Sequence, residues 1–475
     1  MSSVRTRFAP SPTGFLHVGG IRTALFAYLV ARHDDGKFVL RFEDTDKKRE
    51  VEGAKEHLIL SLNTLGLKHD EGPDIGGPFS PYIQSQRLEI YHKWARKLIA
   101  AGRAYADSYS VKELETLRQQ DQQNKTPFLF RNHRPLKTIE WDGTVPLRFK
   151  SEPKAYEWHD VVMGDLRSSP ESIDDFILIK SDGYPTYNFA HIIDDLEMEI
   201  THVLRGQEFL SSIPNYLNLY EALGISRPLL ATLPLVLGPD GKKKLSKRDG
   251  AKDIMDYIRD GYLPEALVSF IATLGWNDGT TQEIFTMEEL IAKFDLNKVQ
   301  KSGALFDEKR LTWINGTLIR SKTIDDLYEL AASYWPEEAA DAEASYKRLV
   351  LSLLQERLKY LAEIPELSLF FFVEPQIMPE LIKNNKHLKK LSRDELINLL
   401  TVSLASLNVS DFSIDDLNSR LNQLLVSTNQ KPAVLFSLIR IATTQAPASP
   451  GLSDTLHVLG KERSLLRIKR QLDSL

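Results

Sequence analysis

Residues 5–31, RTRFAPSPTGFLHVGGIRTALFAYLVA, carry the clearest structural signal in the chain. The first residues alternate as in a short buried strand, Pro10 and Pro12 interrupt regular structure, and apolar residues recur at helical spacing from Ile21. The glycines between them allow loop conformations that other residues resist. Backbone N–H groups at a helix start behind such a loop suit a phosphate. The segment therefore predicts an anion-binding strand–loop–helix unit, with an ordinary first unit of a parallel sheet as the alternative.

A second segment, GPDGKKKLSKRDG at residues 238–250, is bounded by glycines and strongly cationic. The Pro-Asp-Gly triplet near its start predicts a turn. A basic run is usually a solvated face or a nonspecific contact for polyanions. A cationic loop of this kind is also suited to closing over a triphosphate and its departing pyrophosphate. The two segments together favour a nucleotide-binding enzyme.

Both segments resemble the signature motifs of class I aminoacyl-tRNA synthetases. His17-Val18-Gly19-Gly20 is similar to the His-Ile-Gly-His motif, and residues 244–248, KLSKR, are similar to the Lys-Met-Ser-Lys-Ser loop. The longer context RFAPSPTGFLHVGGIRTALFAYL resembles the bacterial glutamyl-tRNA synthetases, and the resemblance continues along the whole chain. Gly20 replaces the second histidine of the generic motif, which removes one donor to ATP, but the glutamyl branch commonly shows this replacement.

The resemblance implies ATP-dependent attachment of L-glutamate to the 3′ end of tRNA(Glu) through a glutamyl-adenylate. A carboxylate attacks the α-phosphorus of ATP, so protein groups need only position the reactants and neutralise developing charge. ATP with Mg²⁺ is the expected cofactor. The expected catalytic residues are His17, Lys244 and Lys247, and the expected ATP contacts are His17, Gly19, Gly20, Lys244, Ser246 and Lys247.

The same resemblance implies a glutamate site formed by Arg7, Ala9, Ser11, Glu43, Tyr187 and Arg205. Arginine suits bidentate recognition of a carboxylate, so Arg7 and Arg205 are expected to face the side-chain carboxylate, and Glu43 to hold the α-ammonium. Taken singly, the arginines are also consistent with a strand edge or a helix cap, and the tyrosine with a core position. A glutamine amide would leave buried charge unpaired there. The sequence leaves open whether His191 borders the substrate or packs within its helix.

The predicted fold class is α/β: a doubly wound parallel-sheet nucleotide-binding domain with an α+β insertion, followed by an all-α C-terminal helix-bundle region. Residues 37–42 read as a second strand that ends in acidic residues, at the edge where open α/β sheets bind ligands. Residues 47–65 read as one helix. Regular βα alternation lapses over about residues 86–190, which we interpret as the insertion.

The expected domains are a catalytic part over residues 1–320 and a helical region over 321–475, where apolar residues recur at helical spacing. The resemblance implies that the insertion grips the acceptor end of tRNA. It also implies that residues of about 240–320 contact the tRNA stem and that the helical region binds the anticodon. The residues that read the anticodon cannot be placed from one sequence.

Composition narrows the class of protein further. The chain has 475 residues, a net charge of −5 and no cysteine. Some members of the resembled family hold zinc through cysteines, so no zinc and no other metal site is expected here. The N-terminus lacks the apolar run of a signal peptide and no apolar stretch is long enough to span a membrane, so we expect a cytoplasmic protein without membrane contact. Local basic patches for RNA remain compatible with the acidic net charge.

The expected partners are tRNA(Glu) and L-glutamate, with tRNA(Gln) left open, and a monomer is expected. One alternative is a glutaminyl-tRNA synthetase, which shares the catalytic part but has a β-barrel C-terminal region, against which the helical pattern argues. Another is a noncatalytic tRNA-binding paralogue, which would be expected to lose His17 or the lysine loop, and both are present.

Overall fold

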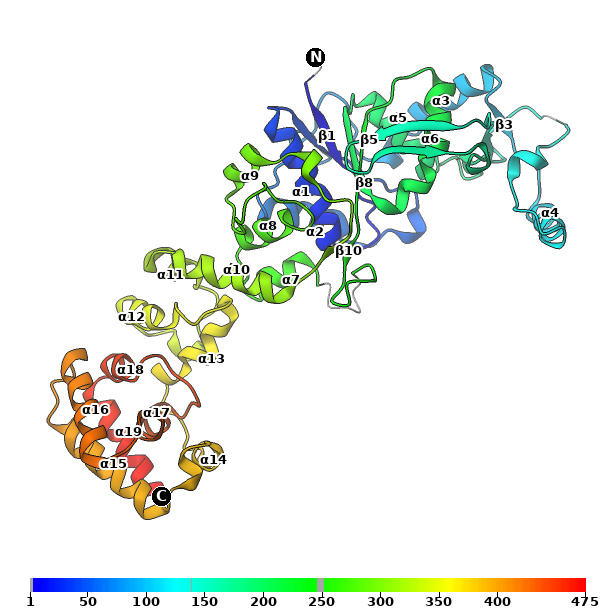
Figure 1. Ribbon diagram of the computed structural model, residues 1–475. Helices are drawn as coiled ribbons and strands as arrows, with labels where there is room; N and C mark the ends of the chain where they lie inside the picture. Colours follow the sequence, from blue (N-terminus) through cyan, green and yellow to red (C-terminus); the bar gives the residue numbers. More distant parts are fainter. Residues whose placement is uncertain (1–2, 138, 246–251) are drawn as a thin grey trace. The chain divides into compact units, whose positions relative to one another are not determined.

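The computed structural model describes residues 3–137, 139–245 and 252–475 (Figure 1). It divides into two compact units. The first unit comprises Met1–Ile258 with Pro264–Arg310, and the second comprises Arg259–Leu263 with Leu311–Leu475. The first unit is α/β and the second is helical, as the predicted fold class requires.

A four-stranded parallel sheet forms the centre of the first unit. Its strands in spatial order are β2 (Lys37–Leu40), β1 (Arg5–Phe8), β8 (His202–Gly206) and β9 (Leu229–Leu233). The chain leaves β1 for β2 on one side, and later returns to pair β8 on the other side of β1. In open α/β sheets, the crevice outside the carboxyl ends of strands at such a switch point is where ligands bind.

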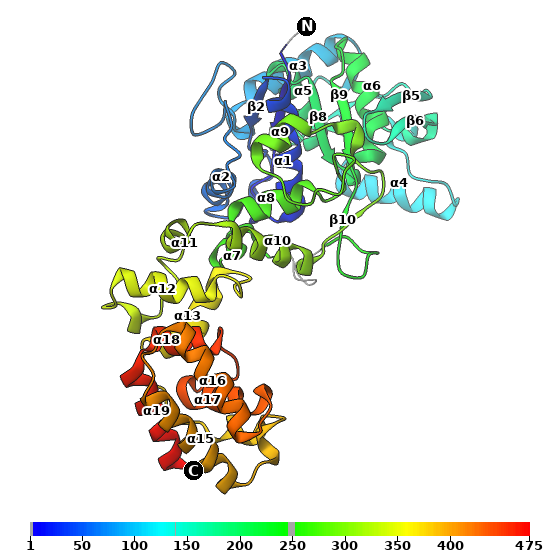
Figure 2. The ribbon, with the colours of Figure 1, turned by 60° about the vertical axis from the view of Figure 1, so that its left-hand side comes forward.

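Helices cover both faces of this sheet (Figures 1 and 2). One face carries α1 (Val18–His33), against which α8 (Pro264–Ala272) and α9 (Met287–Lys293) pack. The other face carries α3 (Leu88–Ala100), α5 (Tyr187–Glu197) and α6 (Ile213–Leu223). Fully buried apolar side chains from α3, α5 and α6 and from β2 and β8 form one core, which includes Val39, Tyr91, Ile192, Val203 and Leu219.

Helix α1 begins three residues earlier than the apolar pattern indicated, because Gly19 and Gly20 lie within its first turn. A Cβ on Gly20 would lie 2.7 Å from Leu16 Cδ1, so the close approach of the preceding loop favours glycine there. The predicted helix over residues 47–65 is wrong in its first part. Gly53 has a φ of 75°, which separates a short 3₁₀ turn from α2 (Ala54–Thr64).

Antiparallel structure replaces βα alternation after α3. A three-stranded sheet contains β3 (Ala104–Ala106), β4 (Leu147–Phe149) and β7 (Ile177–Ile179), in that order. Helix α4 (Val111–Gln123) starts at a capping box between Ser110 and Glu113. The sequence analysis missed the hairpin of β5 (Tyr156–Asp160) and β6 (Gly164–Ser168). Further along, β10 (Val236–Leu237) pairs in parallel with β11 (Ala304–Leu305).

The second unit has no strand among its described residues. The residues of α7 (Ile254–Arg259) and of α10 (Glu308–Ser321) are divided between the two units. The α-helices that belong wholly to the second unit are α11 (Ile324–Leu330), α12 (Ala344–Leu354), α13 (Ile364–Ser368), α14 (Pro379–Asn384), α15 (Arg393–Asn408), α16 (Ile414–Thr428), α17 (Pro432–Thr444), α18 (Leu452–Leu459) and α19 (Lys461–Ser474). Ser392 and Ser413 cap α15 and α16, since each side chain accepts a backbone N–H three residues on. Leucine and isoleucine side chains of α15 to α19 form its core.

Candidate active site

A cavity of about 530 Å³ lies at the carboxyl ends of β1 and β8, where the sheet topology predicts a ligand. Its lining includes every described residue that the sequence analysis assigned to the site: Arg7, Ala9, Ser11, His17, Gly19, Gly20, Glu43, Tyr187, Arg205 and Lys244. Ser246 and Lys247 lie outside the described residues. The chain therefore brings the predicted ATP and glutamate residues into one space, and their individual roles stay predictions.

The N-terminus of α1 forms one side of this cavity. His17 is the N-cap residue, and its Nδ1 accepts a hydrogen bond from the backbone N–H of Gly19 at 3.2 Å. A neutral imidazole with Nδ1 as acceptor carries its proton on Nε2, so His17 presents a donor. Because α1 has 16 residues, its N-terminal dipole adds a positive potential at the same place. This side of the cavity suits phosphate oxygens.

Lys244 and Glu208 form an ion pair at the cavity lining. Lys244 Nζ lies 2.9 Å from Glu208 Oε1. Burial alone would raise the pKa of Glu208, but the hydrogen bond from Lys244 holds that pKa below its ordinary value. A Cβ on Gly206 would overlap the Glu208 carboxylate, so Gly206 lets that side chain fold back against the end of β8. The sequence analysis did not assign Glu208, although an acidic residue just after a strand end is a signal for it.

Arg205 is buried, with 6% of its surface exposed, and its Nε and Nη1 have no hydrogen-bond partner among the described residues. Aromatic rings surround it: the guanidinium carbon lies 5.4 Å from the ring centroid of Tyr216 and 5.9 Å from that of Phe209. A buried unpaired charge is costly, and a carboxylate binds a guanidinium fork through two hydrogen bonds. The unpaired guanidinium nitrogens therefore favour the binding of an anionic ligand group beside Arg205.

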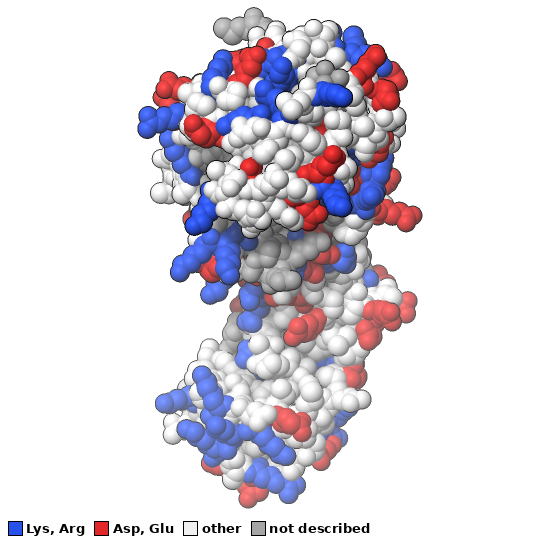
Figure 3. Space-filling view, turned by 90° about the vertical axis from the view of Figure 1, so that its right-hand side faces the viewer, with Lys and Arg blue, Asp and Glu red and all other residues white. Residues whose placement is uncertain are grey.

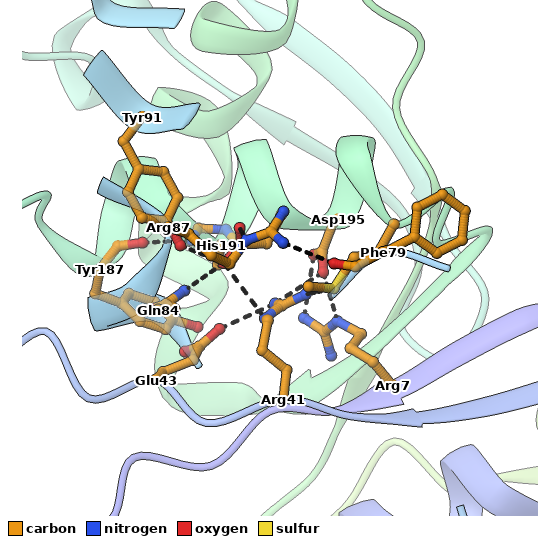
Figure 4. Close-up of polar contacts among 12 residues, drawn as sticks. Arg7, Arg41, Glu43, Phe79, Gln84, Arg87, Tyr91, Tyr187, His191 and Asp195 are labelled. Carbon is orange, nitrogen blue, oxygen red and sulfur yellow. Dashed lines mark hydrogen bonds and ion pairs between the residues drawn. The ribbon is translucent and has the colours of Figure 1, made fainter. Parts of the chain in front are cut away.

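Arg7 is held by Asp195 on α5 (Figure 4). Arg7 Nε donates to Asp195 Oδ1 at 3.0 Å, and its Nη1 donates to the Leu204 carbonyl at 3.0 Å. Burial alone would raise the pKa of Asp195, but Arg7 and Arg41 lower it far below its ordinary value. Asp195 is thus ionised and fixes the orientation of Arg7 at the cavity wall.

Arg41 is fully buried, does not line the cavity and was missed by the sequence analysis (Figure 4). Its Nη2 donates to Glu43 Oε1 at 3.0 Å and to Asp195 Oδ1 at 2.9 Å. Burial raises the pKa of Glu43 in spite of the nearby Arg41 and Arg7. The Glu43 backbone N–H donates to the Pro10 carbonyl at 3.0 Å, which joins Glu43 to the loop after β1.

His191 lies behind Tyr187 and does not line the cavity. The two rings stack with centroids 4.7 Å apart, and His191 Nδ1 lies 2.7 Å from the Tyr187 carbonyl. Burial and the nearby Arg205 lower the pKa of His191 well below its ordinary value, so the ring is neutral. A carbonyl only accepts, so Nδ1 carries the proton and the buried Nε2 is an acceptor that has no partner among the described residues.

His133 is a further histidine, and it does not line this cavity. Its Nε2 is 2.6 Å from Asp121 Oδ2 and its ring stacks on Phe128 with centroids 5.2 Å apart.

Within the described ranges, no group of three or more His, Cys, Asp or Glu side chains is placed to hold a metal ion. Nor does any described helix have the length and apolar character needed to cross a membrane.

Comparison with known proteins identifies this arrangement. The sequence profile "tRNA synthetases class I (E and Q), catalytic domain" matches residues 3–313, and the profile "Anticodon binding domain" matches residues 326–472. The fold and the cavity are therefore those of a class I tRNA synthetase.

Individual relatives indicate which family of class I tRNA synthetases the chain belongs to. The glutamate–tRNA ligase of Clostridium botulinum strain Hall is 41% identical, covering 100% of this chain and 99% of its own. That of Dehalococcoides mccartyi strain CBDB1 is 40% identical, covering 98% and 96%. A crystal structure of a glutamate tRNA ligase from Elizabethkingia meningosepticum in complex with its amino acid has a TM-score of 0.89 at 31% identity, covering 100% of both chains. The chain belongs to the glutamate–tRNA ligase family, which confirms the family and the fold class predicted from the sequence.

Proposed function

We propose that this chain attaches L-glutamate to the 3′ end of tRNA(Glu) in two steps, through a glutamyl-adenylate. The observation that carries the proposal is the buried Arg205, whose Nε and Nη1 lack partners among the described residues. The same cavity contains the N-terminus of α1 with His17. One side of the cavity thus suits a carboxylate and another suits phosphate, as a ligase that joins glutamate to a nucleotide requires.

In the first step, an α-carboxylate oxygen of glutamate attacks the α-phosphorus of ATP and pyrophosphate leaves. No side-chain nucleophile is needed, so the protein acts by positioning and by neutralising charge. His17 Nε2–H and the first N–H groups of α1 are suited to donate to phosphate oxygens. Lys244 and Lys247 supply cations for the departing pyrophosphate. Loss of one well-placed donor typically raises such a barrier by about 2.7–4 kcal/mol.

Glutamate binding uses the other side of the cavity. Arg205 pairs with the side-chain carboxylate, and Arg7 adds positive potential from a position fixed by Asp195. Glu43, whose Oε1 is already bonded to Arg41, accepts the α-ammonium, and the loop with Ala9 and Ser11 lines the space beside it. A glutamine amide would leave the Arg205 charge unpaired, so the site discriminates against glutamine.

In the second step, the ribose of the terminal tRNA nucleotide attacks the adenylate and AMP leaves. Lys and Arg side chains gather on one face of the second unit (Figure 3). Exposed cations of this unit that lie close together in sequence are Lys383, Lys386, Lys389, Lys390 and Arg393. Burial and the neighbouring Arg357 lower the pKa of Arg440, which shows that these two cations lie close enough to repel each other. These features support contact with the tRNA backbone through the second unit.

We further infer that ATP enters as its magnesium complex, that the insertion over about residues 86–190 holds the tRNA acceptor end, and that a cytoplasmic monomer is the working form. The helical second unit disfavours the glutaminyl alternative, and the presence of His17 and Lys244 at one cavity disfavours a noncatalytic paralogue.

The deciding experiment is aminoacylation of tRNA(Glu) and tRNA(Gln) with labelled glutamate and, separately, labelled glutamine, with and without ATP. We expect ATP-dependent charging of tRNA(Glu) with glutamate, and the tRNA(Gln) arm tells whether that tRNA is also a substrate. Charging of glutamine at least as fast as glutamate would overturn the substrate assignment. ATP-independent incorporation would overturn the adenylate step.

A further inference from the structure

The segment that follows the cationic loop returns to the phosphate side of the cavity. Asp253 pairs with His17 in an isolated antiparallel bridge. The next residue continues this contact, since the backbone N–H of Ile254 donates to the Leu16 carbonyl at 3.3 Å. The backbone that emerges from the loop is therefore joined directly to the residue predicted to contact the ATP phosphates.

A side chain from a third element reinforces this junction. His57, on α2, places its Nε2 3.1 Å from Asp253 Oδ1. The same Oδ1 accepts the backbone N–H of Met255 at 2.7 Å, so Asp253 also caps the start of α7. Phe15 also contacts His57: the two ring centroids lie 4.6 Å apart, and Phe15 lines the cavity.

The His57–Asp253 pair is mostly shielded from solvent, since the two side chains are 22% and 15% exposed. Its distinguishing property is its location, because one end contacts a cavity wall at Phe15 and the other end holds the backbone beside His17.

We propose that His57 is a positioning residue for adenylate formation, which fixes the backbone of Asp253 and Ile254 against the His17 loop through Asp253 and Phe15. The inference rests on the proposed function. His57 touches neither glutamate nor the reacting phosphate. It acts by holding two ATP-binding segments in a fixed relative position. Its loss should therefore lower kcat/KM for ATP and leave the binding of glutamate unchanged.

The test compares His57→Ala and Asp253→Asn with the wild-type chain, with tRNA present and ATP or glutamate varied. We expect kcat/KM for ATP to fall about five- to twentyfold in His57→Ala, a loss that lies within the range of couplings between residues in contact. The loss should be smaller in Asp253→Asn, because its amide oxygen still accepts a hydrogen bond from His57. KM for glutamate and the melting temperature should stay unchanged. His57→Gln, which keeps a donor toward Asp253, should recover most of the loss, and the double variant should be no worse than His57→Ala.

Asp74→Asn is the matched control, because Asp74 pairs with His69 at 2.7 Å in the same unit and does not line the cavity. It should leave kcat/KM for ATP unchanged. An unchanged kcat/KM for ATP in His57→Ala, or equal losses for ATP and glutamate with a lower melting temperature, would overturn the positioning role.

Calorimetric titration with ATP alone separates this inference from the proposed function. Its readout does not depend on ligation, and we expect a several-fold weaker Kd for ATP in His57→Ala than in Asp74→Asn. If the wild-type chain bound ATP but ligated no glutamate, the proposed function would fail while this difference would still support the role of His57. Equal Kd values for the two variants would contradict it.

Discussion

The guanidinium carbon of Arg205 lies 5.4 Å from the ring centroid of Tyr216, in a buried setting that offers its Nε and Nη1 no hydrogen-bond partner among the described residues. This relationship makes glutamate binding the most direct point to test. Arg205→Gln should lower kcat/KM for glutamate by roughly 10- to 200-fold, since a hydrogen bond to a charged group contributes about 1.5–3 kcal/mol. Arg49→Gln, at a side chain that is 73% exposed, is the control. A loss below twofold in Arg205→Gln would contradict the assignment.

Lys247 tests the cationic loop, although it lies outside the described residues. Lys247→Ala should reduce ATP–pyrophosphate exchange by at least about 100-fold, because a cation that neutralises the leaving pyrophosphate acts mainly in the transition state. Filter binding should show tRNA affinity largely unchanged. Near-normal exchange in this variant would remove the loop from the mechanism.

A substitution of Arg41 tests the buried charge network that joins Glu43 to α5. Its guanidinium lies among three carboxylates, at 3.0 Å from Glu43, 3.6 Å from Asp194 and 2.9 Å from Asp195. Arg41→Leu should lower the free energy of unfolding by about 3–5 kcal/mol, since it leaves buried carboxylates without their counter-ion. The measurement is the midpoint of the urea transition, with Arg49→Leu as the exposed comparison. Coincident transitions for the two variants would mean that the network does not stabilise the fold.

His191 tests the predicted pH dependence of stability. Burial and Arg205 hold the pKa of folded His191 well below 6.5, whereas the unfolded chain binds a proton near that pH. The unfolded state therefore binds more protons below pH 6.5, so this contribution is present above that pH and is lost as the pH falls. Between pH 7.5 and 5.5, wild type should lose about 1.4 kcal/mol more stability than His191→Asn. Thermal melts across this range give the comparison, and parallel losses would show that His191 does not titrate in this way.

Local chemistry made the first strand, the loop and α1 predictable, because prolines, glycines and apolar spacing act over a few residues. The resemblance located the site residues, and all of those that the structure describes line one cavity. The β5–β6 hairpin carried a usable signal, since Tyr156 and Trp158 alternate with charged residues, but its buried Asp160 obscured the pattern. The break before α2 depended on the left-handed conformation of Gly53, which sequence spacing does not reveal.

Pairings across long sequence separations were beyond prediction. Arg41 reads locally as one charged residue in a strand pattern, and its burial makes sense only beside Asp195, 154 residues away. Lys244 reads as a cation of the loop, and only the folded chain shows that Glu208 holds it. In both cases the position of the side chain is set by an ion pair between residues far apart in the sequence. The partner can therefore be identified only from the folded structure.

The position of β1 between β2 and β8 has a consequence for how the chain is made. Arg5 at the start of β1 donates to Thr201, 196 residues further on, so β1 leaves the ribosome long before its second neighbour exists. At a synthesis rate of about 5–20 residues per second, one side of β1 stays unpaired for about 10–40 s. During synthesis, that strand presents an open backbone edge to chaperones and to other nascent chains.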